Sequence, residues 1–125
     1  MQGANEADEV EQAFGEFIAA FNAMDLQRLR NCFSPQITLF APAAVPGLIV
    51  GAGSVCAHFE RVFEAEPASG PTVRPAGVQV SKLAPGVALV TFEFARPLGS
   101  VGRRTIAFQE SDGHWWVAHI HASNT

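Results

Sequence analysis

The residues best suited to chemistry gather near the C-terminal end of the sequence, between Trp115 and Ser123. His119 and His121 stand two residues apart, so both imidazoles point to the same face of a strand. An imidazole exchanges protons near neutral pH, and we therefore take both histidines as candidate catalytic residues. No third ligand stands at a suitable local spacing, so we expect no metal, and no cofactor motif is present.

These residues need a sheet to position them, and the second half of the sequence predicts one. Its strands run over residues 73–83, 87–96, 101–110 and 114–122, and turn residues separate them. The first half predicts helices around residues 10–21, after Asp25 and after Ser54, with short strands at 36–41 and 48–50.

The order of these elements, ααββαββββ, is typical of an α+β fold. A long antiparallel sheet twists and curls. We expect a cone-shaped, curved, mixed or antiparallel sheet covered by three helices, with a pocket at the open end. The length suits a single domain spanning residues 1–125.

The turns set which side chains share a face. Counting from Asp112-Gly113 places Phe108 opposite Val117 and Ile106 opposite His119, and centring the previous turn on Gly99-Ser100 places Glu93 opposite Ile106. The resulting face mixes aromatic walls with a few polar groups, as ligand pockets do. The predicted pocket residues are Phe40, Phe59, Glu93, Arg104, Ile106, Phe108, Trp115, His119 and His121.

The opposite face of these strands is then nearly all apolar. Since the helices cover only one face, a second copy of the chain is the simplest cover for the other. We therefore predict a homodimer through this outer face, formed by Phe92, Phe94, Trp116 and Ile120.

The last strands also carry a recognisable pattern: Asp112-Gly113, Trp115, His119, His121 and Ser123. It resembles the last hairpin of SnoaL-like domains of the nuclear transport factor two-like superfamily, and most of all that of the calcium/calmodulin-dependent protein kinase II association domain. The phenylalanine-rich first helix and Gly51 before the third helix fit the same family. The resemblance implies a cone-shaped α+β fold, usually dimeric, that serves isomerases, cyclases, dehydratases and oligomerisation domains.

The sequence departs from the isomerases of that superfamily. It contains no Tyr, and Ala41 stands where their aspartate base would lie. Two function classes stay open. One is a small-molecule-binding or oligomerisation domain, whose ligand is a carboxylate or a hydrophobic compound. The other is a lyase or isomerase with His119 or His121 as acid or base and Arg104 stabilising an anion.

Composition excludes other partners. The net charge is −4 and the eight Lys and Arg are scattered, whereas nucleic-acid binding needs a clustered basic face. No segment reaches the roughly 18 apolar residues of a membrane span. The acidic start of the sequence lacks the apolar run of a signal peptide, so we expect a cytoplasmic protein.

Overall fold

The structure is a computed structural model, and it describes residues 5–42, 47–66 and 72–125. Three helices and six strands follow in the predicted order. The elements are α1 (Glu6–Asn22), α2 (Leu26–Cys32), β1 (Phe33–Phe40), β2 (Ile49–Val50), α3 (Ala52–Ala65), β3 (Ala76–Ala84), β4 (Val87–Ala95), β5 (Val101–Ser111) and β6 (His114–Asn124), with a short 3₁₀ turn at Pro97–Gly99.

The helices form where caps and apolar spacing predict them. The Asn5 side chain accepts a hydrogen bond from the backbone N–H of Asp8 at 2.9 Å, which caps α1. Asp25 caps α2 in the same way through Arg28. The third helix begins earlier than expected: Gly51, with φ of 95°, precedes its first turn, and Ser54 already lies inside it.

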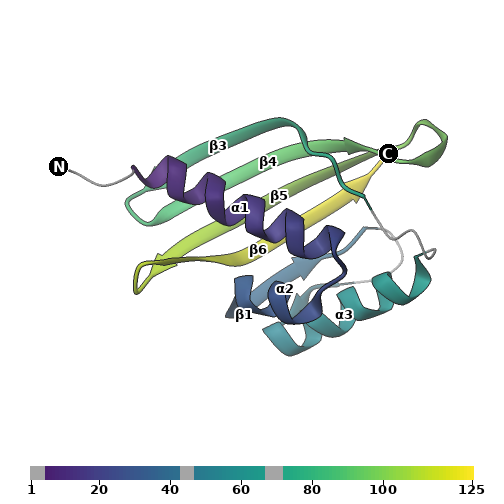
Figure 1. The fold of residues 1–125 in the computed structure, drawn as a ribbon, viewed down its shortest axis with the longest axis horizontal. Coiled ribbons are helices and arrows are strands. Elements are labelled where there is room, and N and C mark those ends of the chain that lie inside the picture. The colour runs from purple at the N-terminus through teal and green to yellow at the C-terminus, as the bar shows by residue number, and fades with distance from the viewer. Residues whose placement is uncertain (1–4, 43–46, 67–71) are drawn as a thin grey trace.

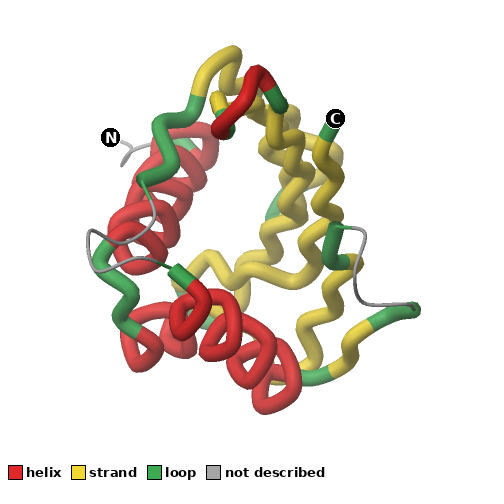
Figure 2. Tube along the Cα trace, turned by 90° about the vertical axis from the view of Figure 1, so that its right-hand side faces the viewer, coloured by secondary structure: helices red, strands yellow, loops and turns green. Residues whose placement is uncertain are grey.

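The six strands form one mixed sheet in the order β2-β1-β6-β5-β4-β3. β1 pairs in parallel with β6, and the other neighbours are antiparallel. All three helices lie on one side of the curved, open sheet (Figures 1 and 2). These features confirm the predicted α+β architecture. No helix within the described residues is long and apolar enough to cross a membrane.

The pairing of β5 with β6 matches the prediction only near the turn. Phe108 lies opposite Val117 as expected, but the next pair is Ala107 with His119, so Ala118 is an extra residue on β6. Such a β-bulge moves every later side chain of the strand to the other face. Ile106 therefore lies opposite Ile120, and the expected pairing of Ile106 with His119 is wrong.

The pairing of β4 with β5 also differs from the prediction. The connection is longer than a tight turn centred on Gly99-Ser100. It contains the 3₁₀ turn Pro97–Gly99, in which Leu98 and Gly99 both adopt positive φ angles, 63° and 78°. Ala95 consequently pairs with Val101, and Glu93 with Arg103 instead of Ile106. The slip is an odd number of residues, so it reverses the faces of β4 relative to β5.

These two corrections change the predicted dimer surface. Phe92 and Ile120 are buried in the core, 5% and 3% exposed, and Phe94 packs against that core. Of the four residues assigned to the outer face, only Trp116 lies outside the core cluster. Three of the four residues predicted to form the dimer surface, Phe92, Phe94 and Ile120, therefore belong to the face that the three helices cover.

Candidate functional site

A cavity of about 740 Å³ lies between the helices and the sheet. Its volume is in the range of small-molecule sites. Arg96, Pro97 and Asn124 lie at the end of the sheet where β4 turns into β5 and β6 ends (Figure 1). The walls are mostly apolar, and their aromatic and aliphatic members include Phe17, Ile18, Phe21, Leu39, Phe59, Val62, Val73, Phe92, Phe94, Ile106 and Ile120.

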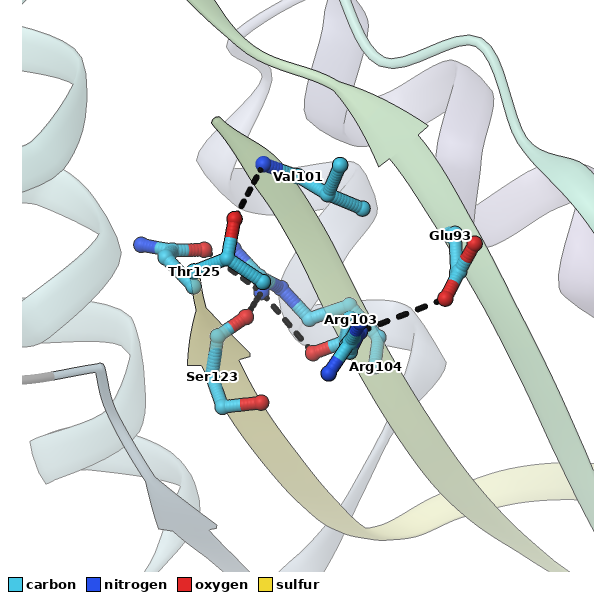
Figure 3. A network of polar contacts seen from close by, with 7 residues as sticks. Glu93, Val101, Arg103, Arg104, Ser123 and Thr125 are labelled. Atoms are coloured by element: carbon cyan, nitrogen blue, oxygen red, sulfur yellow. Dashed lines mark hydrogen bonds and ion pairs between the residues drawn. The ribbon is translucent and has the colours of Figure 1, made fainter. Parts of the chain in front are cut away.

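Charged side chains reach this cavity from Glu66, from Arg96 and, on β5, from Arg104. The guanidinium of Arg104 donates hydrogen bonds from its Nη1 to the carbonyl oxygens of Arg103 and Ser123 at 3.0 and 2.9 Å, and to Asn124 Oδ1 at 3.2 Å (Figure 3). Its Cζ lies 4.8 Å from the centroid of the Phe94 ring. The bonds to Nη1 leave Nε and Nη2 without a hydrogen-bond partner among the described residues.

No carboxylate among the described residues forms an ion pair with this guanidinium. The ion pairs within the described part of the chain join Arg28 to Glu16, Lys82 to Glu6 and Arg103 to Glu93, so Arg104 has none. Burial, and then repulsion by Arg96, lower the pKa of Arg104 to about 10. It stays protonated at neutral pH, so the cavity holds a half-buried cation with a free donor edge.

Gly102 explains how the Phe94 ring comes to lie beside Arg104. Phe94 and Gly102 are paired residues on β4 and β5. A Cβ on Gly102 would lie 2.8 Å from Cε2 of the Phe94 ring and closer still to Cζ and Cε1. The absence of a side chain at Gly102 therefore lets the ring cross the strand and approach Arg104.

The structure separates the predicted pocket residues into three groups. Phe59, Arg104 and Ile106 line the cavity. Phe108 and Trp115 belong to the solid core beyond it, 1% and 5% exposed, and Trp115 Nε1 donates to Glu9 Oε1 at 2.9 Å. The remaining four, Phe40, Glu93, His119 and His121, do not line the cavity.

These four lie on the outer face of the sheet. His119 Nδ1 and Thr38 Oγ1 share a hydrogen bond of 2.7 Å. The Phe40 ring contacts both imidazoles, with centroids 5.9 Å from His119 and 5.5 Å from His121. Burial, then the neighbouring His121, lower the pKa of His119, and Thr38 opposes that shift. The sheet separates this cluster from the cavity, and Glu93 and His121 instead line a second, smaller hollow, to which Arg104 also contributes.

His58 on α3 also lines the cavity, although it is not among the predicted pocket residues. Burial, then the charge of Arg61, lower its pKa below 6.5. The sequence signal was its place beside the buried Phe59 on the apolar stripe of α3. Phe94 and Arg96 were missed because the predicted strand register turned β4 over. No three His, Cys, Asp or Glu residues come together as a metal site in the described ranges.

Comparison with solved structures shows the same fold. An NTF2-like protein of unknown function from Pseudomonas putida has a TM-score of 0.80 and 21% identity, with 97% of this chain and 89% of that chain covered. A ketosteroid isomerase-like protein from Erwinia carotovora atroseptica has a TM-score of 0.81 and 18% identity, with 98% of each chain covered.

The CaMKII hub of S. rosetta has a TM-score of 0.78 and 19% identity, with 99% of this chain and 100% of that chain covered. At these identities the likeness shows the fold alone. No curated protein matches the sequence. A model of the SnoaL-like domain matches residues 10–125, nearly the whole chain. The chain therefore belongs to the SnoaL-like domain family.

Proposed function

We propose that this protein binds a small organic carboxylate with an apolar body in the cavity between its helices and sheet. The observation that carries the proposal is the half-buried Arg104, which has no carboxylate partner among the described residues. A cation withdrawn from water without a counter-ion is costly, and an anionic ligand would compensate that cost.

The geometry around Arg104 suits this ligand. Three hydrogen bonds and the Phe94 ring hold the guanidinium in place before any ligand arrives. The free Nε and Nη2 groups form a planar fork that matches the two oxygens of a carboxylate. The phenylalanines of the cavity walls then favour a hydrophobic or aromatic body on the same ligand.

Calorimetry with 3-phenylpropanoate tests the proposal, with 3-phenylpropan-1-ol as the uncharged analogue. We expect the carboxylate to bind the wild-type chain and the alcohol to bind more weakly. Arg104→Gln removes a charge-assisted hydrogen-bond pair worth about 1.5–3 kcal/mol, so its affinity should fall about 10- to 100-fold.

Arg103→Gln is the matched control because Arg103 precedes Arg104 on the same strand but is exposed and paired with Glu93. Its affinity should stay within about twofold of the wild type, since exposed ion pairs contribute little. Equal losses in the two variants, or equal binding of acid and alcohol, would contradict the role of Arg104.

A second proposal is self-association, which an apolar edge of the sheet favours. Phe40, Leu48 and Val50 are 41%, 46% and 60% exposed. The pairing of Thr38 with Val50 and of Leu39 with Ile49 places β2 beside β1, which carries Phe40, and Leu48 directly precedes β2. We propose that a second copy covers this edge. A monomer in native mass spectrometry at micromolar concentration would contradict it.

The remaining expectations about the surroundings stay predictions. The expected cytoplasmic location is one of them. We propose no acid–base role for His119 or His121 in the cavity, because neither histidine lines it.

A further inference from the structure

The outer face of β6 carries two imidazoles that the proposed function does not use. His119 and His121 stand two residues apart, and the stretch from one to the other pairs regularly with β5, since the bulge at Ala118 precedes both. Their side chains therefore project from the same face of the sheet, with Cα atoms about 6.7 Å apart. Two imidazoles placed in this way can turn their rings toward one point in front of the strand.

The neighbouring strand β1 orients the ring of His119. Its Nδ1 lies 2.7 Å from Thr38 Oγ1. When Nδ1–H donates to that hydroxyl oxygen, the free lone pair of the ring is on Nε2, which is not hydrogen-bonded to a described residue. Metal-binding histidines are fixed in the same way, by a hydrogen bond from the ring nitrogen that does not hold the metal. Thr38 therefore supplies the tautomer and the orientation that an ion at Nε2 requires.

The ring of His121 is also available to a ligand. This side chain is exposed, and its nitrogens are not hydrogen-bonded to other described residues. The Phe40 ring contacts both imidazoles, with centroids 5.5 Å from His121 and 5.9 Å from His119. Because this contact limits the movement of both rings, less side-chain entropy is lost when an ion binds them.

The charged groups near the pair largely offset one another. Glu93 and Arg103 line the hollow that includes His121, and Arg103 Nε lies 3.2 Å from Glu93 Oε2 in an ion pair. Arg104 contributes to the same hollow, but its guanidinium lies over the Phe94 ring, which lines the cavity. No third His, Cys, Asp or Glu within the described residues completes a cluster. An ion bound here would therefore keep water in its remaining positions.

From this placement we propose that His119 and His121 chelate one divalent first-row transition-metal ion on the outer face of the sheet, with Cu²⁺ bound most tightly. Imidazole suits copper, nickel and zinc, and affinity along this series peaks at Cu²⁺. Two imidazoles and two water molecules also suit the tetragonal geometry of Cu²⁺. The expectation of no metal rested on the missing third ligand, whereas a chelate needs only two. The site is separate from the cavity and does not depend on carboxylate binding there.

Calorimetry with NiCl₂ and EPR spectroscopy with one equivalent of CuCl₂ test the proposal on the full chain. We expect one saturable Ni²⁺ site and a copper spectrum with two imidazole nitrogens. His121→Gln should remove the Ni²⁺ site and leave one imidazole nitrogen in the copper spectrum. Thr38→Val keeps both ligands but removes the hydroxyl that orients His119, and loss of such a partner lowers metal affinity about 10- to 100-fold.

His114→Gln is the matched control because His114 is exposed on the same strand, five residues before His119, and packs on Trp116. It should bind both ions as the wild type does. Ni²⁺ binding that persists in the double variant His119→Gln/His121→Gln would place the ion elsewhere and overturn the proposal. Absence of binding by the wild type, or equal losses in His114→Gln and His121→Gln, would overturn it as well. Unchanged affinity in Thr38→Val would refute the positioning role of Thr38.

Discussion

The substitution Gly102→Ala tests the arrangement that positions Arg104. The new Cβ would lie under 3 Å from three atoms of the Phe94 ring, whereas carbon atoms in contact need about 3.5–4.0 Å. The ring must therefore move by about 1 Å. Since Phe94 sits on the core and under the Arg104 guanidinium, this movement disturbs both packing and the cation–π contact.

The expected magnitude follows from these two losses. Overpacking of this kind lowers the free energy of unfolding by about 1–3 kcal/mol. The cation–π contact between Arg104 and the ring contributes about 0.5–2 kcal/mol to holding the guanidinium in its binding position, and this contribution is lost as well. We expect Gly102→Ala to weaken 3-phenylpropanoate binding about tenfold, which corresponds to about 1.4 kcal/mol.

Urea unfolding measures the stability, and calorimetry measures the binding. Gly15→Ala is the control because Gly15 lies in the exposed face of α1 with nothing within 4 Å of its would-be Cβ. That change should raise the free energy of unfolding by up to about 1 kcal/mol, from helix propensity.

A double variant tests whether the Phe94 ring causes the loss of stability in Gly102→Ala. In a Phe94→Leu background the ring is gone, so adding Gly102→Ala should destabilise the chain less than it does in the wild type. A coupling of at least about 0.5 kcal/mol is the expected result. If Gly102→Ala is as stable as wild type and binds equally well, the reasoning about the ring is refuted.

Two further predictions concern the outer face. The folded chain holds the pKa of His119 below 6.5, so it binds fewer protons than the unfolded chain and stability should fall as the pH drops below about 6.5; urea unfolding of His119→Gln should show a flatter pH profile. Val50→Lys should shift the mass distribution in native mass spectrometry toward monomer, whereas Leu83→Lys, equally exposed at 60% on β3, should not. An unchanged pH profile in the first, or equal shifts in the second, would contradict these expectations.

The sequence determined the elements and their order because these depend on local signals. Caps at Asn5 and Asp25, helical apolar spacing in α1 and turn residues at Asp112-Gly113 all act within a few residues of themselves. The pairing of Phe108 with Val117 followed correctly from that turn. Arg104 was also identified as a pocket residue, although the register used to place it was wrong.

Only the tertiary structure decided which side chains share the cavity. The extra residue Ala118 and the left-handed backbone at Leu98 and Gly99 each shift a strand by an odd number of residues. Gly99-Ser100 signals that the chain turns but not how long the connection is, and Ala118 carries no signal of a bulge. Each odd shift exchanges the two faces of a strand relative to its neighbour. The bulge at Ala118 therefore places the histidines on the outer face, and the longer connection between β4 and β5 places Phe94 on the inner face beside Arg104.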